Sequence, residues 1–107
     1  MTPVERAAAV ATLRDAAALV ERGWTQGAWA RNAAGNGVFY DAPDAVRWCA
    51  IGAIWADDKD RRWGALLALG RHVGIEVSAW NDLPGRTADE VLAALRDCAD
   101  RVERGEL

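Results

Sequence analysis

A nearly continuous apolar segment, Ala45–Ala56, limits most strongly what this chain can fold into. Only Arg47 interrupts it, so a helix formed here would be apolar on every side, and a helix of that kind is buried over most of its surface. Small residues recur along one face of such a helix at steps of three and four, namely Cys49, Gly52, Ala53 and Ala56. The segment therefore predicts a helix from Asp44 to Ala56 at the centre of the core, with room for a neighbouring backbone to approach it.

Two longer amphipathic helices are predicted near the two ends of the chain, each with a recognisable N-terminal cap. The first runs from about Pro3 to Glu21, where Thr2 and Glu5 form a Thr-x-x-Glu capping box. The last runs from about Thr87 to Arg104 and repeats this motif with Glu90. Apolar residues recur in both at steps of three and four, so each helix presents one face to the core.

The residues between the first helix and the apolar segment predict a β-hairpin. Segments 24–31 and 38–40 carry aromatic and β-branched residues, and Gly and Asn residues separate them. Asn36-Gly37 is the strongest turn dipeptide, because both residue types tolerate positive φ, and Gly35 adds a second such position. A two-stranded hairpin is marginally stable alone in water, so we expect it to pack on the helices.

A third helix is predicted from about Asp60 to His72, whereas residues 75–82 fit a short strand and one helical turn equally well. Two acidic pairs, Asp57-Asp58 and Asp89-Glu90, fall at helix starts, where the helix dipole explains them without acid/base or metal chemistry. The predicted fold class is therefore α+β and mostly helical, with about four helices and one β-hairpin packed on them. Residues 1–107 are the length of a single domain.

Charge and residue content argue against several classes of function. The net charge is −3 and the most basic stretch, Lys59–Arg62, follows two aspartates, so we expect no nucleic-acid partner. No apolar run approaches the roughly 20 residues that a membrane span needs. One histidine and two cysteines are fewer than the about four ligands of a structural zinc site, so we expect no metal and no cofactor. Charged residues where an export signal would be apolar predict a cytoplasmic location.

One pair of residues, Cys49 and His72, would permit an enzymatic interpretation. A thiol nucleophile with an imidazole base, oriented by Asn81 or Asp82, would make a small thiol-dependent hydrolase. In the predicted helix, however, Cys49 lies among apolar neighbours, and apolar burial raises the pKa of a thiol. We therefore interpret Cys49 and Cys98 as buried, unbridged cysteines, and the hydrolase remains the alternative function.

Tryptophan is the outlier of the composition, with six in 107 residues. Most of them are expected in the core, but tryptophan is also enriched at binding hot spots. The segment 80–86 is the densest polar group. It either shapes a turn in which Arg86 pairs with Asp82, or forms a polar lip where Asn81, Asp82 and Arg86 recognise a small polar ligand or a peptide. Our candidate binding residues, from the hairpin and from this turn, are Trp24, Gln26, Trp80, Asn81, Asp82 and Arg86.

Three sequence blocks resemble an uncharacterised family of small proteins from bacteria and their phages, catalogued as a domain of unknown function. They are Gly-Trp-Thr-Gln-Gly-Ala at 23–28, Trp-Cys-Ala-Ile-Gly-Ala-Ile at 48–54, and the segment from Trp-Asn-Asp to Glu-Val-Leu at 80–92. The resemblance implies no activity, cofactor or catalytic residue. From the residues we predict a non-catalytic binding or regulatory module that uses the hairpin and the 80–86 turn. Its partner would be another protein or a small polar ligand, and a homodimer is a further possibility.

Overall fold

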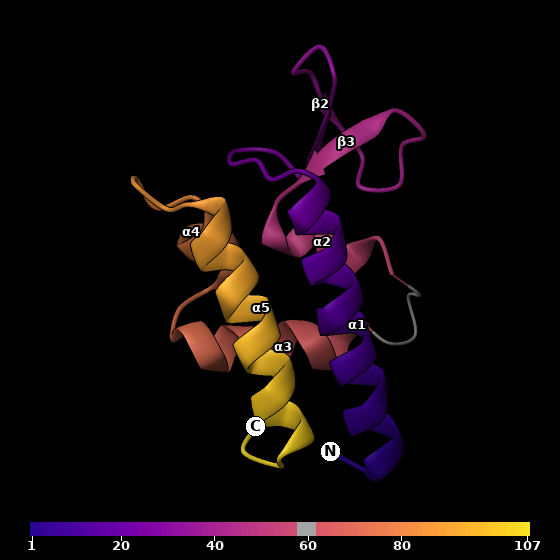
Figure 1. Cartoon of the computed structure of the whole chain (residues 1–107), viewed down its shortest axis with the longest axis vertical. Helices are drawn as coiled ribbons and strands as arrows, with labels where there is room; N and C mark the ends of the chain where they lie inside the picture. The colour runs from indigo at the N-terminus through magenta and orange to yellow at the C-terminus, as the bar shows by residue number, and fades with distance from the viewer. Residues whose placement is uncertain (58–61) are drawn as a thin grey trace.

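The structure, a computed structural model, describes residues 1–57 and 62–107 and shows a helical body with a small sheet at one end (Figure 1). Among these residues, five helices accompany a three-stranded antiparallel sheet, so the predicted α+β class is confirmed. The sequence predicts about four helices and one hairpin, so the structure adds one helix and one strand. The predicted start of the third helix at Asp60, and Asp58 with it, lie outside the described residues.

Three helices form the body of the molecule. Helices α1 (Pro3–Arg22) and α5 (Ala88–Glu103) lie side by side, and α3 (Arg62–Val73) crosses behind them (Figure 1). Both predicted capping boxes are formed, with each threonine hydroxyl accepting the glutamate N–H and each glutamate carboxylate accepting the threonine N–H. These local motifs start α1 and α5 at the predicted positions.

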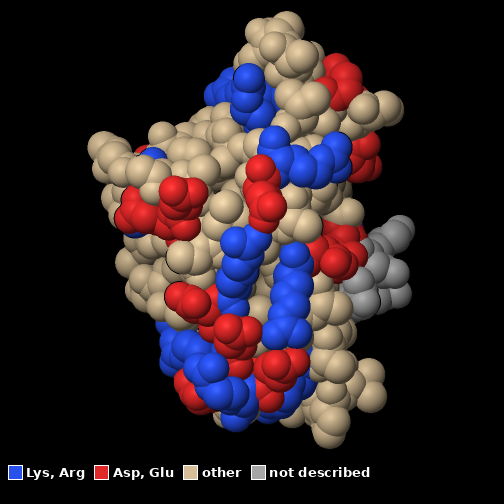
Figure 2. Space-filling model, in the orientation of Figure 1, with Lys and Arg blue, Asp and Glu red and all other residues tan. Residues whose placement is uncertain are grey.

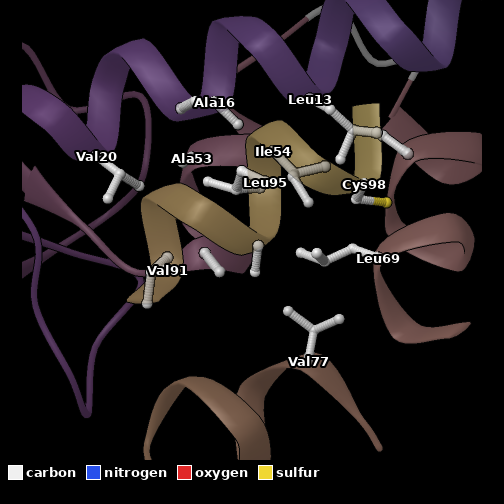
Figure 3. Packing of buried hydrophobic residues seen from close by; sticks show 14 of the residues in the cluster. Leu13, Ala16, Val20, Ala53, Ile54, Leu69, Val77, Val91, Leu95 and Cys98 are labelled. Atoms are coloured by element: carbon white, nitrogen blue, oxygen red, sulfur yellow. The ribbon is translucent and has the colours of Figure 1, made fainter. Parts of the chain in front are cut away.

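The core lies where α1 and α3 pack against both the short helix α2 (Ala50–Trp55) and α5. One large aliphatic side chain from each of these helices points into it, and all are fully buried: Leu13, Ile54, Leu69 and Leu95 (Figure 3). Burying a side chain of this size contributes about 1.5–3 kcal/mol to folding. The central place that the sequence predicts for the apolar segment is therefore confirmed for its second half.

The first half of that segment is a strand, so the predicted single helix from Asp44 to Ala56 is wrong. Strand β3 (Ala45–Trp48) precedes α2, and Cys49 is the N-cap residue between them. On one side β3 pairs with β1 (Ala30–Asn32). On its other side, Trp48 donates its N–H to the Gly23 carbonyl. Non-local pairing decides here, because a short apolar run is compatible with helix and strand alike.

The sheet has the strand order β2–β1–β3, with β2 (Gly37–Val38) at an open edge. The predicted hairpin is confirmed, but it is shorter than expected because residues 26–29 bend instead of extending β1. Its turn places Gly35, not Asn36, at positive φ (86°). The ambiguous segment 75–82 contains the short helix α4 (Val77–Asn81), so the helical alternative is confirmed.

Candidate functional site

Asn81 joins three distant segments of the chain inside the protein. Its side chain is fully buried, and its Oδ1 accepts the indole N–H of Trp24 at 2.9 Å and the backbone N–H of Ala50 at 3.0 Å. Its Nδ2 donates to the Thr25 carbonyl at 3.2 Å and to Asp82 Oδ1 at 3.0 Å. We call these five residues the Asn81 network. The network uses both donors and both acceptor positions of the amide, which is the full capacity of this side chain.

Further hydrogen bonds fasten the segment that follows Trp24 to the end of α4. Gln26 Nε2 donates to the carbonyls of Asn81 and Leu83, at 3.0 Å each. The Gly27 N–H donates to Asp82 Oδ1 at 3.1 Å. The structure therefore brings together Trp24, Gln26, Asn81 and Asp82 as the sequence suggests, but it uses their polar groups internally.

Trp80 and Arg86 form a separate contact at the start of the last helix. The Arg86 guanidinium lies 4.3 Å from the ring centroid of the buried Trp80, and its Nε donates to the Trp80 carbonyl. Arg86 pairs with Glu90, one turn along α5, at 3.0 Å, so the predicted ion pair with Asp82 is wrong. Asp82 instead accepts the hydrogen bonds of the Asn81 network. The candidate residues of segment 80–86 thus make their polar contacts within the fold, either to the turn itself or to segment 24–27 and residue 50.

Sequence reasoning missed the aromatic residues that are exposed. Trp29 exposes 46% of its surface and Phe39 exposes 75%. Trp29 directly precedes Ala30 and Phe39 directly follows Val38, the two residues that pair at the end of the β1–β2 ladder. Trp29 and Phe39 both line a hollow of about 350 Å³, and we call its lining residues the aromatic hairpin surface: Ala28, Trp29, Gly37, Val38 and Phe39. The available signal was the run of three apolar residues at 38–40 beside a predicted turn.

The backbone of Trp29 is fixed to the start of α2. Its carbonyl accepts the Cys49 N–H at 3.1 Å. A Cβ on Gly52 would lie 2.0 Å from that carbonyl oxygen, so only glycine permits this close approach. The close approach that the sequence predicts along the small-residue face is therefore realised at Gly52. As a result, Trp29 projects its ring from a rigidly held peptide.

A series of ring contacts connects Trp29 to the helical body. Its indole stacks on Tyr40, with the centroids 5.3 Å apart and the planes at 22°. The Arg62 guanidinium lies over Tyr40 at 5.7 Å and over Trp55 at 4.5 Å. Trp55 in turn meets Trp63 edge to face at 4.9 Å. These cation–π and aromatic contacts join the sheet to α2 and α3, which limits the movement of the hairpin relative to the body.

The two residues of the alternative thiol mechanism have other partners. Cys49 is the N-cap of α2 and not a mid-helix residue, and its Sγ accepts the Gly52 N–H at 3.2 Å. Burial nevertheless raises the pKa of this thiol. Burial and the neighbouring Arg101 lower the pKa of His72, whose Nδ1 lies 3.0 Å from Arg101 Nη1. No hydrogen bond joins Cys49 to His72 in the described part of the chain.

Charged side chains gather over α1 and α5, where opposite signs alternate (Figure 2). Arg14 pairs with Asp100 and Glu103 across the two helices, and Arg96 pairs with Glu21. Arg14 and Arg96 are thus matched by carboxylates across the two helices. Within residues 1–57 and 62–107, no three His, Cys, Asp or Glu residues are grouped so that they could hold a metal ion. No helix in these ranges is both long enough and apolar enough to cross a membrane.

Comparison with known families finds one that covers most of the chain. The family, described as a family of unknown function (DUF6197), matches residues 4–101. No curated protein and no solved structure matches the chain.

Proposed function

The chain belongs to the DUF6197 family, and we propose that it is a non-catalytic binding module that holds a partner peptide at the aromatic hairpin surface. The observation that supports this is the hollow of about 350 Å³ whose lining includes the exposed residues Trp29 and Phe39. Exposed aromatic residues beside a pocket are the residues that most often dominate binding energy at protein interfaces. A single apolar side chain of the partner fits a hollow of this size.

The backbone of the open edge strand explains why the partner would be an extended peptide. Ala30 pairs with Val38, and Asn32 donates its N–H to the Asn36 carbonyl. Hydrogen bonds in an antiparallel pair alternate, so the N–H and C=O of Gly37 point away from β1. A peptide that pairs with these groups would add a strand beside β2, and one of its side chains would enter the hollow.

In our proposal, the polar candidate residues do not contact the partner. They hold the aromatic hairpin surface in position. The Asn81 network and Gln26 hold segment 24–27, which leads directly into Trp29. Arg31 adds three hydrogen bonds, to Thr25 Oγ1 and to the carbonyls of Gln26 and Gly35. A preformed site loses less conformational entropy on binding, so this rigidity favours affinity.

Gly37→Val is the variant that tests the proposal most sharply. A Cβ at Gly37 meets only Ala28 at 3.7 Å, an ordinary contact, so the fold accepts it. Valine also favours a strand over glycine. The branched side chain, however, fills the hollow. We therefore expect peptides selected from a display library on the unmodified protein to bind Gly37→Val at least about tenfold more weakly, while its thermal stability is kept or raised.

Two further variants separate this surface from the 80–86 turn. Phe39→Ser removes an exposed ring and should also weaken binding of the selected peptides, measured by fluorescence polarisation. Asp82→Asn keeps an oxygen that can accept the hydrogen bonds from Asn81 and Gly27 but removes the negative charge. It should therefore leave peptide binding unchanged. If Asp82→Asn alone abolishes binding, the 80–86 turn is the recognition surface. If neither Gly37→Val nor Phe39→Ser weakens binding, the aromatic hairpin surface is not the site.

A further inference from the structure

A second exposed apolar surface lies on α3, remote in sequence from the hairpin. Trp63 and Leu67 stand one helical turn apart and expose 62% and 59% of their surfaces. Gly70 and Gly74 continue the same line at steps of three and four residues. Opposite this line, α3 contacts the core through Ala65, Ala68 and Leu69, all fully buried.

One end of this line carries a large exposed ring, and the other end is a depression. Trp63, at the start of α3, is 62% exposed although its ring meets Trp55 edge to face, whereas a depression of about 450 Å³ lies at the other end of α3, lined in part by Leu67, Gly70, Gly74 and Ile75. Gly70 and Gly74 leave this depression open because they have no side chain. A Cβ at either position would have no atom within 4 Å, so nothing else in the chain fills the space. We call Trp63 and the four named lining residues the α3 face.

Few charges lie along the α3 face, in contrast to the α1–α5 side. Figure 2 shows the α1–α5 side densely charged, and Figure 1 places α3 behind those helices. Arg71 and Glu76 line the depression. In the part of the chain that the structure describes, Arg71 forms no ion pair, and Glu76 caps α4 through the N–H groups of Ser78 and Ala79. The α3 face is therefore apolar, with Arg71 and Glu76 at the rim of its depression.

We propose that the α3 face is the interface of a homodimer in which two α3 helices pack antiparallel across a two-fold axis near Leu67. A helix rises about 1.5 Å per residue, so Trp63 and Arg71 lie about 6 Å on either side of Leu67 along the helix. The two-fold axis then brings Trp63 of one copy to the height of Arg71 of the partner subunit. That position lies between the two glycines of the partner's depression.

This arrangement gives both ends of the α3 face a partner. The indole of Trp63 fills the depression of the other copy, and the guanidinium of the partner's Arg71 lies over the ring as a cation–π contact. A two-fold interface uses one surface patch twice, so a patch must be complementary to itself. The α3 face meets this condition because its exposed ring and its depression lie at similar distances from Leu67.

The exposed area sets the strength of the dimer. Trp63, Leu67 and Ile75 together expose apolar surface on the order of 300 Å². A standard interface buries about 800 Å² on each partner, and weak or transient ones bury less than about 600 Å². The glycine backbone and the stems of the rim residues add the remainder of a small interface. The dimer therefore dissociates in the micromolar range and is not permanent.

Sedimentation equilibrium of the full chain between about 5 µM and about 500 µM tests the proposal. The protein should shift from monomer to dimer across this range. Leu67→Glu places a charge at the two-fold axis, and Gly70→Leu fills the depression, so each should raise the dissociation constant at least about 30-fold. Both positions are open in the single chain, so the circular dichroism spectrum should be kept, and the thermal stability of the monomer should not fall and should rise for Gly70→Leu, which replaces a glycine inside a helix. Phe39→Ser, outside the α3 face, is the matched control and should dimerise like the unmodified protein.

The antiparallel arrangement has its own test. Leu67→Cys should form a disulfide between the two copies on mild oxidation, because the axis brings the two positions together, whereas Leu83→Cys should not. Both native cysteines are buried and do not interfere. A monomer throughout the concentration range overturns the proposal, and so does a dimer that Leu67→Glu leaves intact. A dimer that cross-links through Leu83→Cys but not through Leu67→Cys overturns the arrangement.

Discussion

Replacing Asn81 by aspartate tests whether the buried amide holds the sheet to the helices. The change is isosteric, so it leaves no cavity. Oδ1 keeps its two donors, Trp24 Nε1 at 2.9 Å and the Ala50 N–H at 3.0 Å. The amide Nδ2, however, becomes an oxygen that faces the Thr25 carbonyl and the Asp82 carboxylate at 3.2 and 3.0 Å. Two donated hydrogen bonds are thereby replaced by two contacts between acceptors.

The magnitude depends on the protonation of the new carboxyl group. When it is neutral, its O–H restores one of the two hydrogen bonds, so the variant loses about 1–2 kcal/mol of unfolding free energy. When it is ionised, an uncompensated charge is buried beside Asp82, and the loss grows to about 3–5 kcal/mol. Burial and Asp82 both raise the pKa of the new carboxyl group in the folded state.

The sign of the pH dependence follows from that raised pKa. The folded state binds the proton more tightly than the unfolded chain, whose aspartate titrates near about 3.9. The stability deficit of the variant is therefore small below about pH 4 and grows by about 1.4 kcal/mol per pH unit until the folded-state pKa is passed. Chemical denaturation with urea at several pH values between about 4 and 7 measures this difference.

Asn36→Asp is the matched control, because it makes the same chemical change at an exposed side chain. It should alter stability by no more than about 0.5 kcal/mol at any pH in the range. The reasoning is refuted if Asn81→Asp costs less than about 1 kcal/mol at pH 7, or if its deficit is independent of pH.

Three other perturbations have clear expected outcomes. Gly52→Ala drives a Cβ to 2.0 Å from a backbone carbonyl and should cost at least about 3 kcal/mol in urea unfolding, whereas Gly64→Ala, which meets only ordinary contacts, should be neutral or stabilising. Burial raises the pKa of the Cys49 thiol and raises that of Cys98 to about 12, so iodoacetamide at pH 8 should modify neither until urea unfolds the protein; rapid native labelling would contradict this. The N–H groups at the start of α4 lower the pKa of Glu76, so its contribution to stability is present above the unfolded pKa and is lost as pH falls through the folded pKa. The stability lost in Glu76→Gln should accordingly be larger at pH 7 than at pH 3, and equal losses would exclude this linkage.

The sequence alone predicted those local features that depend on residues close together in the chain. Helices α1 and α5 begin where their capping boxes predict, because the threonine and glutamate of each box lie only three residues apart. The hairpin turn follows for the same reason, from residues close in the chain. The burial of both cysteines was also predicted, from the apolar character of their surroundings.

Tertiary structure decided the features that join distant segments. Residues 45–48 form a strand because their backbone pairs with residues 30–32 and with Gly23, and nothing within the segment excludes a helix. Asn81 was expected at a polar surface, but it is buried because segments 24–25 and 49–50 converge on its amide. Capping and turn motifs act over three or four residues and can be read locally. Strand pairing and the burial of an amide depend on partners that only the folded chain brings together, and so does the exposure of Trp29.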